Sequence, residues 1–224
     1  MRNHFEATQF QDCIIRALPE VVDRCTSDSI AKCRMKLRRI IKRTAQGVSL
    51  VFVFPGALLC AFGRFTVLYI FFAQLFAIIP GIVGNFWRSA FYKYTLRECS
   101  IDTAISFGTF FSSRDACVGA NASIGSFCVI GRARIGKRTQ ISSHVEIPSG
   151  RHQHRRDEHG RFLDSVDGEV VIGSDCWIGA SAVIMANVGD QSTIGAGSVV
   201  VKDIPARVIA VGAPAKPIKN SVDA

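Results

Sequence analysis

The chain has 224 residues and a mass of 24.4 kDa, the size of one or two ordinary domains. Apolar residues make up 48% of it, enough for a hydrophobic core, so a fully disordered chain is excluded. The formal net charge is +9, but the basic excess lies in one segment, because residues 29–97 hold eleven Lys and Arg and no Asp or Glu. The remaining residues, with 16 basic and 18 acidic side chains, sum to −2.

Eight cysteines are scattered along the chain without a CxxC pair. This pattern indicates a reducing compartment rather than a disulfide framework. The strong apolar run begins near Val48, far too deep in the chain for a secretory signal sequence. We therefore expect no cleaved signal peptide.

Between Thr44 and Trp87 the only charged residue is Arg64, which divides an apolar stretch into Val48–Gly63 and Phe65–Val83. A helix of sixteen residues rises about 24 Å, short of a hydrocarbon core of about 30 Å. We therefore expect a re-entrant hairpin, or helices that lie in the membrane interface, rather than two full spans. The alternative is a buried helical core of a soluble protein.

Basic residues flank this stretch on both sides, and by the positive-inside rule both ends are expected in the cytoplasm. Aromatic residues that suit the headgroup region, Trp87, Tyr92 and Tyr94, follow the stretch closely. The basic cluster suits anionic lipid, and we expect no nucleic acid because no recognised nucleic-acid motif is present. The basic residues are Lys32, Arg34, Lys36, Arg38, Arg39, Lys42 and Arg43 before the stretch and Arg88, Lys93 and Arg97 after it.

From about Ile101 the sequence becomes a series of short units that begin with an aliphatic residue, often followed by Gly. The spacing is mostly six and falls to five once, which gives a period of seventeen and aligns Ile101 with Val118 and Phe107 with Ile124. Such self-similarity predicts a solenoid of three-sided coils. The aliphatic residues are Val118, Ile124, Ile130, Ile135, Ile141 and Ile147 and, after an interruption, Ile172, Ile178, Ile184, Val188, Ile194 and Val200.

Within each unit, the aliphatic residue and the small residue four places later are expected to point inward and stack coil upon coil. The glycine after the aliphatic residue is expected to permit the bend at each corner. About six coils at a strand spacing of about 4.8 Å would give a prism about 30 Å long. The small residues are Ala122, Cys128, Thr139, Cys176, Ala182 and Ser198.

Four further motifs accompany the repeat: Ser149-Gly-Arg-His-Gln-His154, Cys176-Trp-Ile-Gly179, Ile194-Gly-Ala-Gly-Ser-Val-Val-Val-Lys-Asp203 and Val211-Gly-Ala-Pro-Ala-Lys-Pro-Ile218. With the repeat, they resemble the hexapeptide acyltransferases, above all the galactoside, maltose and polysaccharide O-acetyltransferases. The resemblance implies a mainly β fold in which a left-handed parallel β-helix occupies residues 100–219. It also implies a homotrimer with acyl-CoA clefts between neighbouring prisms. An excursion loop at about 150–169, a tail at 220–224 and a preceding α-helical, basic and apolar membrane module at 1–99 complete the expected organisation.

Transfer of an acetyl group from a thioester to a sugar hydroxyl needs a base for the hydroxyl proton, and histidine is the usual choice. Four of the five histidines lie between His144 and His159, where the repeat breaks. The resemblance assigns the catalytic base to His152. His154 is the alternative, because a strand-like run would turn it to the same side, and His144 is expected to line the acceptor cleft. The orienting partner stays open among Glu146, Asp157, Glu158 and Asp164.

The resemblance places acetyl-CoA, as the acyl-donor substrate, along Ala180, Ala196, Val201 and Lys202, with Lys216 and Lys219 at its phosphates. Trp177 matches a family tryptophan near the acceptor, and no metal is expected. Ser126 and Phe127 stand where the galactoside and maltose enzymes carry an Asn or Asp that helps to bind the acceptor. A different acceptor is therefore expected here.

These features predict a membrane-associated O-acetyltransferase on the cytoplasmic face of the bacterial inner membrane. Its acceptor would be a saccharide hydroxyl in a surface polysaccharide or a lipid-linked glycan precursor. The alternatives are an amino-sugar acceptor, an acyl-carrier-protein donor, or a non-catalytic membrane-bound β-helix scaffold. A zinc carbonic anhydrase on the same prism would need three histidines that converge from adjacent coils, whereas His152, His154 and His159 share one loop.

Overall fold

The structure is a computed structural model of the whole chain, and it describes residues 27–63, 66–150, 156–163 and 168–220. The chain divides into two compact units, Met1–Ala45 and Gln46–Ala224. Helix α2 (Ser27–Gly63) contributes to both units. The described part of the first unit is the basic half of this helix, where side chains such as Arg34, Lys36 and Arg39 are exposed.

In the second unit, two further helices follow, α3 (Thr66–Ala77) and α4 (Gly81–Thr95). Twelve residues of α3 rise about 18 Å, well short of a hydrocarbon core of about 30 Å. The chain turns between them at Pro80, which precedes the first residue of α4 in an extended conformation with φ −79°. Among the described residues, one helical segment, Arg34–Cys60, is long and apolar enough to cross a membrane.

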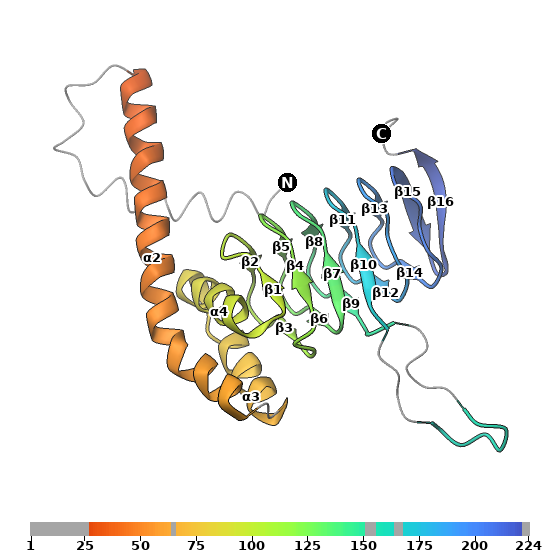
Figure 1. Cartoon of the computed structure of the whole chain (residues 1–224). Helices are drawn as coiled ribbons and strands as arrows, with labels where there is room; N and C mark the ends of the chain where they lie inside the picture. The colour runs from red at the N-terminus through yellow and green to blue at the C-terminus, as the bar shows by residue number, and fades with distance from the viewer. Residues whose placement is uncertain (1–26, 64–65, 151–155, 164–167, 221–224) are drawn as a thin grey trace. The chain divides into compact units, whose positions relative to one another are not determined.

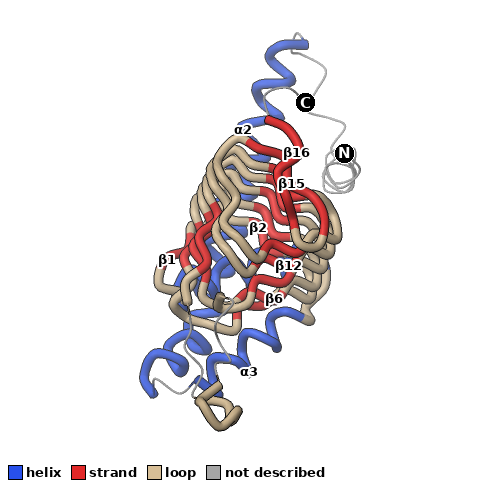
Figure 2. The backbone as a smooth tube through the Cα atoms, turned by 90° about the vertical axis from the view of Figure 1, so that its right-hand side faces the viewer, coloured by secondary structure: helices blue, strands red, loops and turns tan. Residues whose placement is uncertain are grey.

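The rest of the second unit is a parallel β-helix of about six turns, as the repeat predicts, and it is left-handed, as the family resemblance implies (Figure 1). Its strands form three sheets, and each of the first four coils contributes one strand to each sheet. In the later coils the first side is represented by Val188 and Ile204, which form single parallel bridges. The first sheet has the order β1-β4-β7-β10, the second β16-β15-β13-β11-β8-β5-β2 and the third β14-β12-β9-β6-β3. Seen along the axis in Figure 2, the strands gather on separate sides of the stack.

The strands in the described residues are short, and only the C-terminal pair, β15 and β16, is antiparallel. They are β1 (Glu98–Cys99), β2 (Ala104–Ile105), β3 (Phe110–Phe111), β4 (Cys117–Val118), β5 (Ser123–Ile124), β6 (Val129–Ile130), β7 (Ala133–Ile135), β8 (Gln140–Ile141), β9 (Glu146–Ile147), β10 (Val170–Ile172), β11 (Trp177–Ile178), β12 (Val183–Ile184), β13 (Thr193–Ile194), β14 (Val199–Val200), β15 (Val208–Gly212) and β16 (Ala215–Asn220).

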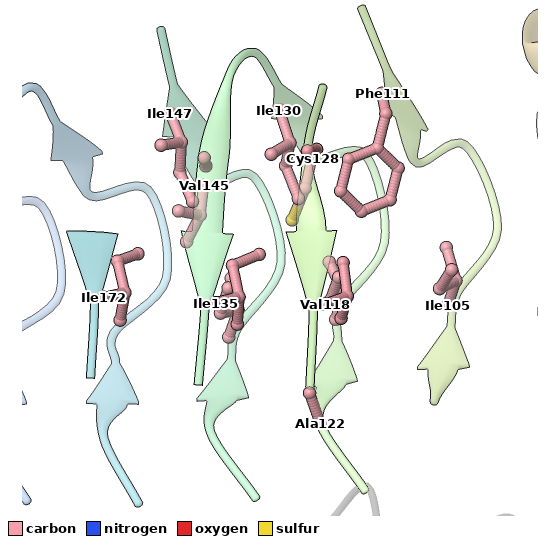
Figure 3. Packing of buried hydrophobic residues seen from close by; sticks show 14 of the residues in the cluster. Ile105, Phe111, Val118, Ala122, Cys128, Ile130, Ile135, Val145, Ile147 and Ile172 are labelled. Atoms are coloured by element: carbon pink, nitrogen blue, oxygen red, sulfur yellow. The ribbon is translucent and has the colours of Figure 1, made fainter. Parts of the chain in front are cut away.

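The interior of the prism is built as predicted from the aliphatic residue of each unit and the small residue four places later. Ile124, Ile130 and Ile147 are fully buried, and Cys128 and Cys176 are core residues. Figure 3 shows side chains of this core, among them Cys128, Ile130 and Ile147, stacked from coil to coil in the interior. The predicted period of seventeen is confirmed between the second and third coils, where Val118 pairs with Ile135. After the excursion the period is sixteen, since Ile178 pairs with Ile194, in line with the shorter spacing at Val188.

The first coil departs from the predicted register. Cys99, and not Ile101, pairs with Val118, and Ile105, and not Phe107, pairs with Ile124. This coil therefore has nineteen residues, because the chain makes a longer corner between Phe111 and Val118. A uniform period of seventeen cannot represent two extra residues in one corner, so the predicted positions of Ile101 and Phe107 were wrong.

The glycine after the aliphatic residue has a different role from the one predicted. At Gly119 and Gly125 φ is not positive, and the left-handed residue comes two places later, at Asn121 and Phe127. The glycine is needed because the next coil passes close by. A Cβ on Gly136 would lie 2.4 Å from the carbonyl carbon of Gly173, a contact that real Cβ atoms do not make. The prediction that this glycine makes the bend was wrong.

The helices cover the core at the open end of the first coil. One face of them is therefore buried, as the alternative of a buried helical core predicted. Tyr69, Ala73 and Phe91 are fully buried, and the rings of Tyr92 on α4 and Phe111 on β3 lie 4.8 Å apart. The opposite face, which we call the outer helical face, is apolar and exposed. Its residues are Val48, Val51, Phe52, Phe54, Leu58, Leu59, Val67, Leu68, Phe71, Leu75, Ile78, Ile82 and Val83.

Candidate functional site

The excursion loop leaves the prism after β9 and returns at β10, and its two ends are held together. The Gly168 amide donates to the carbonyl oxygen of Ser149 at 2.8 Å. The buried Ser149 hydroxyl accepts from the Arg132 amide of the preceding coil at 2.9 Å. The base of the loop is therefore part of the rigid prism, which is the usual arrangement for loops that carry function.

The tip of the loop, residues 156–163, is organised around the carboxylate of Asp157. This carboxylate accepts from the backbone amides of His159 and Arg161, both at 2.9 Å, and from Arg161 Nε at 3.0 Å. The guanidinium of Arg156 stacks on the Phe162 ring, 4.0 Å from its centroid. The carboxylate of Asp157 is therefore used to stabilise the loop tip. It is a weaker candidate than before for the residue that orients a catalytic histidine.

His152 and His154, the candidate bases, lie outside the described residues, as does Asp164. The last described residue before the two histidines is Gly150, which has φ +81° and lies at the corner between the third and first sheets. Of the remaining candidate partners, Glu146 is exposed on β9 directly before the loop, and Glu158 lies at the tip with an oxygen 3.7 Å from His159 Nε2.

A second group of candidate residues lies at the corner between the second and third sheets. His144, Ala180 and Ala196 all belong to the short turns that connect a strand of the second sheet to one of the third. The turns stack directly, since the Ser181 amide donates to Ser143 O at 3.1 Å and the Gly197 amide to Ala180 O at 2.8 Å. The structure therefore brings these three candidates together, and the side chains of Ala180 and Ala196 are small and exposed.

Val201 and Lys202 lie instead at the corner between the third and first sheets, immediately after β14. The excursion loop leaves from the same corner. Lys202 is exposed there, as are Lys216 and Lys219 on β16. Trp177 lies on β11 in the second sheet with 52% of its surface exposed.

One chain thus distributes the candidate residues over two corners, with the third sheet between them. Outward side chains of this sheet form an apolar row interrupted by Glu146, which includes Phe110, Val129, Val183 and Val199. The structure brings His144 close to Ala180 and Ala196, and the loop base close to Val201 and Lys202. It does not bring the two groups together within one chain.

Phe127 is a neighbour of His144 that the sequence did not identify as a site residue. The sequence marked it only as a difference from the galactoside and maltose enzymes. The ring of Phe127 lies 5.4 Å from the His144 ring and 5.4 Å from the Phe107 ring. Phe127 and His144 are seventeen positions apart, so the repeat period could have placed them together. Phe107 was missed because the predicted register of the first coil placed it inside the prism.

The cysteines of the β-helix do not offer a nucleophile. Burial raises the pKa of the Cys128 and Cys176 thiols, although hydrogen bonds from neighbouring groups lower it slightly. A thiolate is the reactive form, so both cysteines are poor nucleophiles. In the described ranges, no three His, Cys, Asp or Glu side chains are placed to hold a metal ion.

Comparison with known proteins agrees with this architecture. The family model for the bacterial transferase hexapeptide (six repeats) matches residues 169–202. The chain is 32% identical over 124 residues to the bifunctional protein GlmU of Wolbachia pipientis wMel, covering 52% of this chain and 29% of that protein. It is 48% identical over 56 residues to the galactoside O-acetyltransferase of Escherichia coli K12, covering 24% of this chain and 28% of that enzyme. The chain therefore spans less than a third of the length of either relative.

Among solved structures, a maltose O-acetyltransferase from Clostridium difficile 630 superimposes on this chain with a TM-score of 0.56 and 26% identity. The superposition covers 66% of this chain and 81% of that enzyme. The β-helix of this chain therefore resembles the bacterial transferase hexapeptide family over residues 169–202 and has a fold similar to that of the maltose O-acetyltransferase.

Proposed function

We propose that the chain is a membrane-associated acetyltransferase that moves the acetyl group of acetyl-CoA to a hydroxyl of a saccharide. The acceptor is a surface polysaccharide or a lipid-linked glycan precursor, at the cytoplasmic face of the bacterial inner membrane. The observation that carries the proposal is the origin of the histidine-bearing loop, which leaves the prism from the corner that also holds Val201 and Lys202. Similarity to galactoside and maltose O-acetyltransferases supports the reaction class.

In the proposed reaction, the imidazole of His152 takes the proton of the acceptor hydroxyl, because a free alcohol is scarcely ionised at neutral pH. The hydroxyl oxygen then attacks the thioester carbonyl carbon, and a backbone N–H or a hydroxyl stabilises the oxyanion. The carbon–sulfur bond breaks, and the proton passes from the imidazolium to the departing CoA thiolate. This route needs no acyl-enzyme, which agrees with the buried cysteines of the prism.

For the acyl donor, the stacked turns with Ala180 and Ala196 offer an extended surface of small exposed side chains. Such a surface lets backbone groups approach the amides of a pantetheine arm. Lys202, Lys216 and Lys219 are exposed near the C-terminal end of the prism, where an ammonium group can pair with phosphate. Trp177 presents an exposed aromatic face that suits a sugar ring.

Membrane association rests on the outer helical face. Monomeric soluble proteins rarely expose a contiguous apolar patch of many large side chains, and this face includes Val51, Phe52 and Val67, each more than 65% exposed. Along α2 the basic residues of its first half directly precede this face, an order that suits anionic headgroups next to the hydrocarbon region. We place this face in the membrane surface.

A homotrimer would complete the site. The candidate residues occupy two corners of one prism, and a cleft between neighbouring prisms would bring one corner of each together. The outward row of the third sheet, with Phe110, Val129, Val183 and Val199, supplies an apolar surface for such a contact.

The test is mass spectrometry of lipid-linked and surface glycans from cells that express wild type, His152→Ala, His154→Ala or His159→Ala. Loss of a general base costs roughly 10²–10⁴ in rate, so His152→Ala should abolish an acetyl increment that the wild type adds. His159 is the matched control, since it is an exposed histidine at the tip of the same loop. Its variant should acetylate normally.

Equal acetylation by wild type and His152→Ala would remove His152 as the base and leave His154 to be judged by its own variant. A wild type that changes no glycan would contradict the saccharide acceptor. Calorimetric titration of the purified protein with acetyl-CoA then separates two explanations. Binding of acetyl-CoA would indicate a transferase with another acceptor, and absence of binding would indicate a non-catalytic scaffold.

A further inference from the structure

An aromatic row runs along the corner between the second and third sheets, from the end of α3 to His144. It consists of Phe107, Phe127 and His144, with successive ring centroids 5.4 Å apart. At the helical end, the Gly108 amide donates to the carbonyl oxygen of Ala77, the last residue of α3, at 2.8 Å. The row therefore adjoins the outer helical face, where Ile78 is 65% exposed.

Phe127 occupies an unfavourable place in the repeat. Its φ is +57°, in the left-handed region, where a bulky residue other than glycine is a genuine outlier. Equivalent left-handed places in the other described units hold glycine or polar residues, namely Gly108, Asn121, Arg138, His144, Asp175, Ser181, Gln191, Gly197 and Arg207. A phenylalanine at this place is conformationally unfavourable and leaves 51% of its surface exposed, so much of its ring is available to a ligand.

The surroundings of Phe127 are also adapted to its ring. A Cβ on Gly108 would lie 2.4 Å from Phe127 Cδ1, so a larger residue at 108 would displace the ring. The Phe107 ring meets it edge-on at 89°, a favourable aromatic geometry. No residue of the row carries a formal charge when His144 is neutral, which gives an apolar path from the helices to the candidate site.

We infer that Phe127, with Phe107, determines acceptor specificity by binding the hydrocarbon part of a lipid-linked saccharide. The inference rests on the proposed function, because the outer helical face must lie in the membrane and the acceptor must be an amphiphile. The tail of such an acceptor reaches the row from the bilayer without crossing water. Its sugar then lies beyond His144, beside Ala180 and the neighbouring turns.

The experiment uses the full-length protein in lipid nanodiscs with a dodecyl galactoside that carries a photoreactive diazirine on its alkyl chain. After irradiation, peptide mass spectrometry should find label on the segment that contains Phe107 and Phe127 as well as on α3. Phe127→Asn keeps a residue that tolerates positive φ, so the fold should survive while labelling of the row falls about tenfold. Phe127→Tyr should label like wild type.

Val171→Asn is the matched control, because it removes a partly exposed apolar side chain from the first sheet. It should leave labelling unchanged. Label confined to the helices, or equal labelling of wild type and Phe127→Asn, would overturn the inference. Dissociation of an oligomer by Phe127→Asn, with no label on the row, would assign the row to a contact between copies and also overturn it.

Turnover gives an independent readout of the same residue. Wild type should show a KM for dodecyl galactoside about tenfold below that for methyl galactoside, and Phe127→Asn should abolish this preference with kcat unchanged. An equal rise of KM for both glycosides would mean that Phe127 contacts the sugar, contrary to the inference. Absence of turnover with both glycosides would exclude galactose as the acceptor sugar, and the labelling experiment still decides the role of the row.

Discussion

The guanidinium of Arg88, on α4, donates through Nε to the backbone carbonyl oxygen of Ile105 in the first coil, at 2.8 Å. The same side chain is fully buried and donates through Nη1 to Phe76 O at 3.0 Å and Ile79 O at 2.8 Å. Burial lowers its pKa to about 10, so it stays protonated at neutral pH. Its charge lies at the carboxyl end of α3, where the helix dipole favours a cation.

Arg88→Ala should destabilise the second unit strongly, because it leaves several buried carbonyl groups without a donor. We expect a loss of about 3–5 kcal/mol in the free energy of unfolding, measured by urea denaturation. Lys93→Ala is the control, since Lys93 is exposed on the same helix and its loss should change stability by less than about 0.5 kcal/mol. Similar midpoints for the two variants would show that the helices are held by apolar contacts alone.

Gly136→Ala should destabilise the prism by about 2 kcal/mol or more, since its Cβ would approach the carbonyl carbon of Gly173 to 2.4 Å. Gly197→Ala is the comparison that separates the cost of a close contact with the next coil from the cost of a positive φ. Gly197 has φ +68°, but a Cβ there would meet no atom of the described residues within 4 Å, so alanine should cost about 1 kcal/mol. Thermal melts compare the two, and a larger loss at Gly197 would contradict the close-approach argument.

Tyr69→Phe should stabilise the protein by about 1 kcal/mol. The Tyr69 hydroxyl is buried without a hydrogen-bond partner in the described parts of the chain, and burial raises its pKa. Tyr92→Phe should have the opposite effect, because the Tyr92 hydroxyl accepts from the Phe111 amide at 3.2 Å. Urea midpoints test the pair, and a destabilised Tyr69→Phe variant would contradict the unpartnered hydroxyl.

The cysteines at 99, 128 and 176 should resist alkylation by iodoacetamide at neutral pH in the folded protein. Burial raises the pKa of Cys99 to about 11 and raises those of Cys128 and Cys176, so the thiolate fraction is small and access is blocked. Peptide mapping should find these sites labelled only after unfolding in guanidinium. Rapid labelling of Cys128 or Cys176 under native conditions would reopen a role for a thiol.

Val183→Arg should convert the proposed trimer to a monomer, as measured by sedimentation in mild detergent. The new guanidinium would lie beside Glu146, the cross-strand neighbour of Val183, so a folded monomer is expected. Ser123→Arg, on the second sheet, is the control and should leave the oligomer intact. An unchanged mass for Val183→Arg would exclude the third sheet as the contact between copies.

Much of the prism follows from local pattern. Ile124 and Ile141, or Ile130 and Ile147, differ by one period, and a repeat places them in register without knowledge of any distant contact. The first coil does not follow from the pattern, because its longer corner is tied to the helices. There the Arg114 guanidinium donates to the carbonyl oxygen of Cys60 at 2.9 Å, a contact between residues 54 positions apart.

The candidate site was only partly predictable for the same reason. The sequence identifies His144, Ala180 and Ala196 as members of a family pattern, and the stacked turns bring them together. It does not reveal that Val201 and Lys202 lie at another corner, since that separation depends on which sheet each strand joins. The seventeen-residue spacing could have placed Phe127 beside His144, whereas the register error in the first coil concealed the contact of Phe127 with Phe107.

The hydrogen bond from Gly168 to Ser149 closes the excursion at its base, and β10 then pairs with β7 as if no residues intervened. Stacking of the coils therefore does not depend on what lies between these two residues. Mutation can lengthen, shorten or replace the excursion while the prism keeps its register and its stability. A chain of this design can change one insertion while the rest of the prism stays the same.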